Sequence, residues 1–240
     1  MIIYPAIDVK NGKCVRLLKG QADKETIYNH SPINQAKFFE DEGAEFLHIV
    51  DLDGAFSGES LNKEVISQVI ANVKIPVQVG GGIRSIDDIN YWFEMGVSRV
   101  ILGTVAIKNP SLLEIATDTH PKKIILGIDA KNELVAIEGW VQVSTLNATD
   151  LINRFKHLPL SHIVYTDIEK DGSKLGPNFE AIKHIAQKSP FPVIASGGVG
   201  SIEDVKRLKI LSEFGVSGVI IGKALYDNAF TLKEVISLSK

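Results

Sequence analysis

The 240-residue sequence contains a single cysteine, Cys14, and few aromatic residues. One cysteine excludes an intramolecular disulfide and a thiolate metal cluster, and it fits a reducing compartment. Hydrophobic residues make up 45% of the chain but aromatic residues only 7%, so the predicted core is large and aliphatic. We therefore expect Cys14 to be a structural residue.

The sequence also lacks an excess of positive charge and any long apolar segment. A net charge of -3 at pH 7 gives no basic field to attract nucleic acid or an anionic membrane, so any phosphate must be bound by local donors. No run of about 20 uncharged apolar residues occurs, and no charged segment followed by an apolar run opens the chain. We expect a cytoplasmic protein with no nucleic-acid or membrane partner. No exposed apolar helix stands out, so a monomer is the default expectation.

Motifs for metals and nucleotide cofactors are missing as well. The histidines are scattered and show no His-x-x-Glu-His spacing, which argues against a zinc site. The glycine-rich runs have neither the spacing of a dinucleotide fingerprint nor the Gly-Lys-Ser/Thr of a P-loop. The sequence therefore predicts neither a metal nor a cofactor.

One segment of the sequence occurs twice. Val79–Ile89 is similar to Ala195–Val205, and the two copies lie 116 positions apart, close to half the chain. This period is too long for a solenoid and suits a barrel made of two equal halves, about 1–120 and 121–240. The repeat also implies two similar anion sites facing one substrate.

Short apolar runs alternate with amphipathic segments eight times along the chain. The predicted strands are Ile2–Val9, Phe46–Leu52, Pro76–Gly80, Arg99–Gly103, Lys123–Asp129, Ser161–Thr166, Pro192–Ser196 and Gly218–Gly222. A helical pattern follows each of them, and Ser31, Ser85 and Ser201 are placed as helix N-caps. The alternation and the absence of a linker predict one domain over 1–240, an α/β fold of the (βα)₈ TIM-barrel type with an internal twofold repeat.

Two connections are longer than is usual after a barrel strand. They are the polar segment Lys19–His30 after the first strand and the stretch Lys131–Thr149 after the fifth. We interpret both as mobile lids that become ordered over a substrate.

Two aspartates end strands at equivalent places in the halves. Asp8 ends the first strand and Asp129 ends the fifth, 121 positions later. Because barrel active sites lie at the C-terminal ends of strands, the two carboxylates are expected to face each other across the barrel mouth. Opposed carboxylates suit general acid–base chemistry, whereas the alternative is a pair of strand-end caps or salt-bridge partners.

Two glycine clusters follow strands in matched positions. The first-half cluster and its second-half counterpart are Gly81, Gly82, Gly103 and Thr104, and Gly197, Gly198, Gly222 and Lys223. Glycine lets backbone N–H groups and a helix N-terminus approach an anion closely. A single cluster is often only a tight turn, but two matched clusters predict a substrate with a phosphate at each end.

Four segments together carry a family resemblance that covers essentially the whole chain. They are Ile7–Leu17, Gly80–Arg84, Thr166–Gly172 and Ser196–Val199. The chain resembles the phosphoribosylformimino-5-aminoimidazole carboxamide ribotide isomerases of histidine biosynthesis. The resemblance implies a (βα)₈ barrel that converts an N-glycosidic aminoaldose to the corresponding aminoketose, an Amadori rearrangement, with no metal or redox cofactor.

The resemblance also implies roles for the paired carboxylates. Asp129 corresponds to the general acid that protonates the ribose ring oxygen, and Asp8 corresponds to the base that removes the C2′ proton after ring opening. An acid at neutral pH requires that the pKa of Asp129 be raised when substrate is bound.

Further residues are similar to substrate contacts in this family. Arg16 and Arg84 offer planar donors to phosphate or carboxamide oxygens, with a solvated loop arginine as the alternative. Trp140 is placed to stack on a ring of the substrate if its loop closes, or to plug the loop. The remaining candidate contacts are His48, Thr166, Asp171 and Ser196. A histidine within a strand is more often a hydrogen-bonded core residue.

Three alternative functions stay open. The nearest is the cyclase of the same pathway, another twofold barrel with paired aspartates, which takes ammonia from a glutaminase partner. The second is an isomerase that also accepts phosphoribosylanthranilate in tryptophan synthesis. The third, from a different class, is a non-catalytic barrel that binds phosphorylated metabolites, which the intact Asp8 and Asp129 argue against.

Overall fold

Eight parallel strands form a closed barrel in the computed structural model, which describes residues 1–18, 21–58 and 60–240. The barrel strands are β1 (Ile2–Lys10), β4 (Leu47–Asp51), β5 (Val77–Gly80), β6 (Arg99–Leu102), β7 (Ile124–Lys131), β10 (His162–Asp167), β11 (Val193–Ser196) and β12 (Val216–Ile221). Each pairs with the next in parallel, and β12 pairs with β1 to close the ring. The predicted TIM barrel is confirmed, and its eight strands agree with the expected ones to within about two residues at each end.

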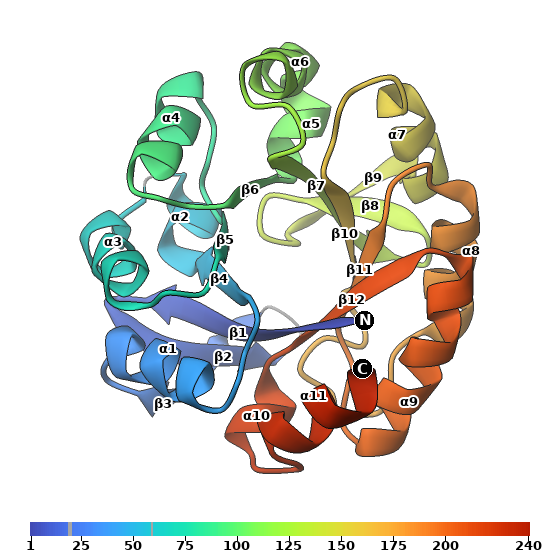
Figure 1. The fold of residues 1–240 in the computed structure, drawn as a ribbon. Helices are drawn as coiled ribbons and strands as arrows, with labels where there is room; N and C mark the ends of the chain where they lie inside the picture. Colours follow the sequence, from blue (N-terminus) through green and yellow to red (C-terminus); the bar gives the residue numbers. More distant parts are fainter. Residues whose placement is uncertain (19–20, 59) are drawn as a thin grey trace.

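Helices form a ring around the strands (Figure 1). They are α1 (Pro32–Asp41), α2 (Leu52–Ser57), α3 (Lys63–Asn72), α4 (Ile86–Glu94), α5 (Thr104–Lys108), α6 (Pro110–Thr119), α7 (Ala148–Phe155), α8 (Phe179–Lys188), α9 (Ile202–Ile210), α10 (Lys223–Tyr226) and α11 (Leu232–Ser239), with a 3₁₀ turn at Leu211–Phe214. The three predicted N-caps are confirmed, because Ser31, Ser85 and Ser201 each accept a hydrogen bond from the third residue of their helix. The two chain ends lie together, where the Met1 amino group donates to the Ser239 carbonyl oxygen at 3.0 Å.

The two long connections are β-hairpins rather than irregular loops. After β1, strands β2 (Lys13–Leu18) and β3 (Gln21–Asn29) extend the sheet, and after β7, strands β8 (Leu134–Ile137) and β9 (Gln142–Asn147) do the same. Tight turns at Asn11 and Asn132, both with φ of +48°, reverse the chain at equivalent points. Residues 19–20 of the first predicted lid lie outside the described residues, and ordering of either hairpin over a ligand stays a prediction.

Alternation along the strands separates two cores. Side chains facing the helices form the larger one, for example Ile7 and Val9 on β1. Side chains facing the barrel axis form a smaller plug that includes Tyr4, Ala6 and Ile220. Since successive side chains point to opposite faces, the next inward position on β1 after Tyr4 and Ala6 is Asp8. The alternation along the strand therefore points polar side chains at the C-terminal strand ends into the barrel mouth, above this plug.

The structure also bears on the single cysteine and on the lack of a long apolar segment. Cys14 is fully buried in the larger core, where burial raises the pKa of its thiol to about 12, as suits a structural residue. In the described part of the chain, no helix has the length and apolarity needed to cross a membrane.

Candidate active site

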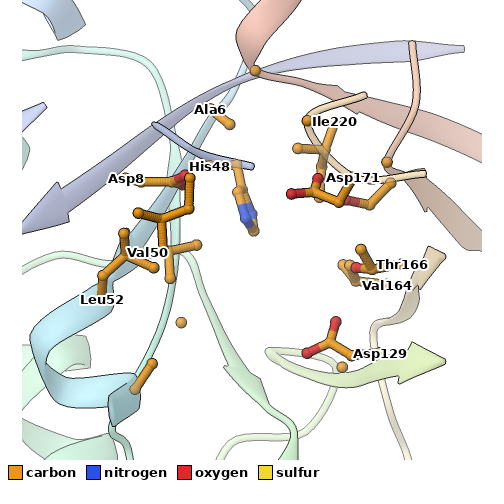
Figure 2. Close-up of a pocket in the computed structure, with 18 of the residues that line it drawn as sticks. Ala6, Asp8, His48, Val50, Leu52, Asp129, Val164, Thr166, Asp171 and Ile220 are labelled. Atoms are coloured by element: carbon orange, nitrogen blue, oxygen red, sulfur yellow. The ribbon is translucent and has the colours of Figure 1, made fainter. Parts of the chain in front are cut away.

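A cavity of about 260 Å³ opens at the C-terminal ends of the barrel strands. Its walls include Asp8, Arg16, His48, Gly81, Gly103, Thr104, Asp129, Trp140, Thr166, Asp171, Ser196, Gly197, Gly198, Gly222 and Lys223. Figure 2 shows Asp8, Asp129 and Asp171 around this space, with His48 pointing into it. The structure therefore brings together fifteen of the seventeen predicted site residues, and the other two, Gly82 and Arg84, lie elsewhere.

Asp8 is held by a buried arginine. The Nη1 group of Arg16, on β2, donates to Oδ2 of Asp8 at 2.6 Å, and Nη2 donates to the Ala6 carbonyl oxygen. Burial raises the pKa of Asp8, while the positive charge of Arg16 and its hydrogen bond oppose that rise. Both Nη groups of Arg16 thus donate hydrogen bonds within the protein. The sequence predicted a contact with phosphate or carboxamide oxygens, whereas in the structure Arg16 holds the Asp8 carboxylate.

Asp129 has neutral neighbours instead. It lies at the end of β7, in register with Thr166 on β10. Burial raises the pKa of Asp129, and hydrogen bonds from Trp140 and Thr166 partly offset the rise. Among the described residues no cation pairs with Asp129 as Arg16 does with Asp8, so only hydrogen bonds from neutral groups oppose the effect of burial on its pKa.

Asp171 is a third carboxyl group in the same cavity. Burial is the largest cause that raises its pKa to about 7, and the negative charges of Asp8 and Asp129 add to it while Arg16 opposes it. A group with this pKa is about half protonated at neutral pH. The sequence pointed to Asp171 only as a substrate contact, whereas the cavity also makes it a candidate proton carrier.

His48 is part of the cavity wall and is also hydrogen-bonded. Its Nδ1 atom lies 3.0 Å from Nε2 of Gln78, its neighbour on β5. Burial and the charge of Arg16 lower the pKa of His48 to about 3, so the ring is neutral at pH 7. His48 is therefore hydrogen-bonded inside the barrel and also lines the cavity, and its contact with a substrate stays a prediction.

The paired glycines are required by close packing of neighbouring backbone. Gly81 has φ of +100°, and a Cβ there would lie 2.2 Å from the Asp51 carbonyl oxygen. Gly197 has φ of +93°, and a Cβ there would lie 2.8 Å from the Asp167 carbonyl oxygen. The same contact in both halves brings the backbone after β5 and β11 to the cavity. Tight turns and anion cradles are therefore compatible readings of these glycines.

Two short helices begin at the cavity without a side-chain cap. Gly103 precedes α5 with φ of -105° and ψ of -97°, and Gly222 precedes α10 with φ of -108° and ψ of -98°. Neither glycine can cap its helix, so the first N–H groups of each turn suit an anionic ligand. A Cβ at Gly222 would also lie 2.6 Å from Cζ of Arg16, so this glycine leaves room for the arginine that holds Asp8.

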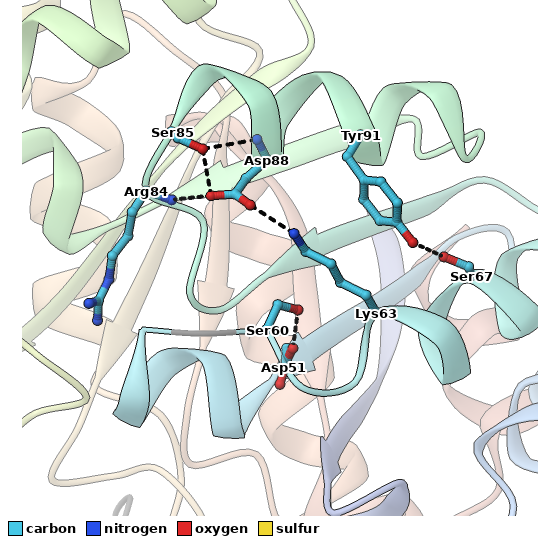
Figure 3. A network of polar contacts seen from close by, with 8 residues as sticks. All are labelled: Asp51, Ser60, Lys63, Ser67, Arg84, Ser85, Asp88 and Tyr91. Atoms are coloured by element: carbon cyan, nitrogen blue, oxygen red, sulfur yellow. Dashed lines mark hydrogen bonds and ion pairs between the residues drawn. The ribbon is translucent and has the colours of Figure 1, made fainter.

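Gly82 and Arg84 lie outside the main cavity. Both line a smaller neighbouring cavity together with Gly103, Thr104 and Lys108. In Figure 3 the Arg84 guanidinium points away from the network in which the Ser85 hydroxyl and Lys63 donate to Asp88. Gly103 and Thr104 line both cavities. Arg84 and Gly82 are therefore placed for contact with an anion in this neighbouring cavity and not in the main one.

Trp140 lies at the tip of the β8–β9 hairpin. Glu138, Gly139 and Trp140 all have positive φ, between +57° and +72°. The tip rests on the first half of the barrel, because the Glu138 N–H donates to the Thr104 hydroxyl at 3.0 Å and its carboxylate pairs with Lys108. In this docked position Trp140 is a wall of the cavity. Stacking on a substrate ring stays a prediction.

Sequence reasoning missed a pair of buried aspartates that shape the two rims. Asp51 accepts from the Gly54 N–H at 3.0 Å and from Asn62 at 2.7 Å, and Asp167 accepts from the Lys170 N–H at 3.2 Å and from Asn178 at 2.8 Å. Each Asp–Asn pair is separated by eleven positions, and the pairs lie 116 positions apart, as the repeat does. Extending the repeat upstream of the glycines would have revealed them.

Comparison with known proteins agrees with this geometry. Residues 2–231 match the family described as Histidine biosynthesis protein. Proteins named 1-(5-phosphoribosyl)-5-((5-phosphoribosylamino)methylideneamino) imidazole-4-carboxamide isomerase from Geotalea uraniireducens and Geobacter sulfurreducens are each 48% identical to the chain over 240 residues, covering 100% of the chain and 98% of the relative. The protein of that name from Syntrophus aciditrophicus is 48% identical, with 100% and 99% covered. The chain belongs to the histidine biosynthesis protein family.

Proposed function

We propose that this protein is the aldose–ketose isomerase of histidine biosynthesis that converts the bisphosphorylated aminoaldose named in its relatives to the corresponding aminoketose. The observation that carries the proposal is a single cavity holding Asp8 and Asp129 between two matched glycine clusters. Full-length relatives at 48% identity with this isomerase name support it. The reaction moves protons and rearranges one sugar, so acid–base groups are sufficient for it.

The two rims suit the two ends of such a substrate. Gly81, Gly103 and Thr104 form one rim, and Gly197 with Lys223 forms part of the other. Backbone N–H groups at an uncapped helical turn bind phosphate by hydrogen bonds and by the local dipole. Lys223 is a cation that lines the main cavity at the second rim, whereas Arg84 and Lys108, beside the first rim, line the neighbouring cavity. We therefore expect tighter phosphate binding at the second rim.

Asp8 is the proposed base. Its ion pair with Arg16 at 2.6 Å favours the carboxylate, which is the form that removes a proton from carbon. Arg16 also fixes the direction of the carboxylate by its second hydrogen bond to the Ala6 carbonyl oxygen. The C2′ proton of the ring-opened substrate would pass to this carboxylate.

Two carboxyl groups are candidates for the acid that protonates the ring oxygen. The family resemblance assigns this role to Asp129, whose pKa burial raises. The electrostatics also favour Asp171, because its pKa of about 7 lies nearest the pH at which an acid must be protonated yet able to release its proton. The three carboxyl groups titrate as a coupled set, so their protonation is a property of the cluster.

Turnover of the purified protein alone tests the proposal. The bisphosphorylated aminoaldose is supplied without ammonia or a partner protein, and aminoketose formation is followed beside Asp8→Asn and an exposed control, Asp150→Asn. We expect conversion by the wild type and the control, and a loss of about 10²–10⁴-fold in Asp8→Asn. Absence of conversion, with turnover of the aminoketose once ammonia is added, would assign the protein to the cyclase reaction instead.

Specificity and assembly are proposed from the same features. We propose that the protein acts as a monomer in the cytoplasm on a small bisphosphorylated molecule, with no nucleic acid, membrane or protein partner. Size-exclusion chromatography with light scattering tests the monomer. Competition by phosphoribosylanthranilate in the turnover assay tests whether the cavity also accepts the substrate of the tryptophan pathway.

A further inference from the structure

Gln78 is a fully buried polar residue that the proposed mechanism has not used. It lies on β5 beside His48 on β4, one inward position below Gly80, and none of its side chain is exposed. Its Oε1 atom has no hydrogen-bond partner among the described residues. An apolar side chain of this size would fill the space without leaving a buried carbonyl oxygen unpaired, so packing alone does not explain a glutamine here.

The contact that Gln78 does make is with the ring of His48. The amide nitrogen Nε2 of Gln78 and Nδ1 of His48 are 3.0 Å apart. In this orientation of the amide its NH₂ group can only donate, which makes Nδ1 the acceptor and places the single N–H of a neutral imidazole on Nε2; the opposite orientation would require the Nδ1–H tautomer. The charged group that acts on this ring is Arg16, and its positive charge, like burial, favours the neutral ring.

The other side of the ring is open to the cavity. His48 lines the cavity, whereas Gln78 does not. Figure 2 shows the imidazole in the space that Asp8, Asp129 and Asp171 surround. A neutral N–H group there can donate to an oxygen of a bound sugar without adding a charge that would disturb the three carboxyl groups.

We infer that Gln78 is a positioning residue: it holds His48 with Nδ1 as acceptor and Nε2–H directed into the cavity, where it donates a hydrogen bond to a sugar oxygen of the substrate. The inference rests on the proposed isomerase function for the identity of the ligand. Its structural part, the tautomer set by Gln78, does not depend on that function. Second-layer partners that fix the orientation of a histidine commonly affect activity in this indirect way.

The tautomer is measured first, in the ligand-free protein. Long-range ¹H–¹⁵N correlation spectra of the histidine side chains are recorded, and His48 is assigned by its absence in His48→Ala. We expect the Nε2–H tautomer in the wild type. In Gln78→Glu, measured at a pH at which the new side chain is ionised, we expect the proton to shift to Nδ1, because a carboxylate can only accept. A Nδ1–H tautomer in the wild type, or no change in Gln78→Glu, would overturn the inference.

Kinetics then test whether Gln78 acts through His48. Gln78→Glu and the similarly long, non-donating Gln78→Met are expected to lower kcat about tenfold or more, with a smaller change in KM. In the His48→Ala background each is expected to change kcat less than twofold. A loss of similar size in both backgrounds would mean a merely structural role.

A matched control separates these effects from burial of a carboxylate. Gln35 is also buried, but it lies on α1 and contacts Asn29 rather than the cavity. Gln35→Glu is expected to leave the His48 tautomer and kcat unchanged. If the wild type has no isomerase activity at all, the proposed function fails while the NMR result still decides the role of Gln78.

Discussion

The two halves of the barrel share one scaffold but differ in the side chains that face the cavity. Asp51 and Asp167 fix the loops after β4 and β10 with the same kind of asparagine contact, and Gly81 and Gly197 pack on them in the same way. Backbone geometry therefore repeats wherever a rim of the cavity is built. A substrate with an anion at each end needs two such similar rims.

The centre of the cavity does not repeat. His48 is matched by Val164 in the second half, and Asp171 is matched by Ala55 in the first. Asp8 has a cationic partner, while Asp129 has neutral ones. Isomerisation needs a base at one point and an acid at another. Equivalent positions of the two halves must therefore carry different side chains or have different neighbours at the centre of the cavity.

Removal of the general acid is expected to cause the largest change, a loss of kcat, among the tests of how the two halves differ. Asp129→Asn and Asp171→Asn are compared by kcat and by pH–rate profiles, with exposed Asp150→Asn as the control. The variant that lacks the acid should lose about 10²–10⁴-fold in kcat. From its pKa we expect Asp171 to be that acid, and wild-type activity to fall as the pH rises above about 7. A larger loss in Asp129→Asn would keep the acid role with Asp129.

The repeated glycines offer a test of the shared scaffold. Gly81→Ala and Gly197→Ala should each lower the free energy of unfolding by about 2–4 kcal/mol, because the new Cβ meets backbone in a left-handed conformation. The loss should be greater for Gly81, where the new Cβ would lie 2.2 Å from a carbonyl oxygen rather than 2.8 Å. Gly43 has a similar φ of +94° but its nearest atom is 4.0 Å away, so Gly43→Ala controls for strain alone. Equal losses for the three variants in urea unfolding would contradict the packing argument.

The pH dependence of stability should reveal the crowded carboxyl groups. The pKa of Asp171 is about 7 in the folded protein and 3.8 ordinarily, so the folded state binds more protons between these values. Stability is therefore lost as the pH rises from about 4 to about 7. Asp171→Asn should remove part of this loss and be more stable than the wild type at pH 8, by on the order of 1–3 kcal/mol, with little difference at pH 4. Unfolding curves that differ equally at both pH values would rule this out.

The smallest expected effect concerns the two rims. Lys223→Met should raise KM about tenfold with little change in kcat, because one cation of the second rim is lost. Thr104→Val at the matched position removes a hydroxyl, together with the hydrogen bond that it accepts from the Glu138 N–H, and should raise KM less because no charge is lost. The exposed Lys156→Met serves as the charge control. Equal KM changes at the two rims would argue against a stronger second anion site.

The sequence predicted the barrel well because its signals are local. The eight short aliphatic runs and the serine caps depend on neighbours along the chain, and the half-chain repeat is found by comparing the sequence with itself. The sequence showed the segments after β1 and β7 only as long connections and not as hairpins, since polar, half-exposed strands such as Gln142–Asn147 show little alternation of apolar residues. Their pairing is decided by the turns at Asn11 and Asn132 and by the edge of the barrel strand beside them.

Most of the polar residues that line the cavity were also predicted from the sequence. Strand-end position and the repeat placed Asp8, Asp129 and the glycines at one mouth, because parallel strands of a barrel end at the same face. Only the tertiary structure decided the partners: Arg16 with Asp8, Gln78 with His48, and Asp171 among the other carboxyl groups. These contacts join strands and hairpins distant in sequence, and the charge state of each group depends on burial and on neighbours that only the closed barrel brings within reach.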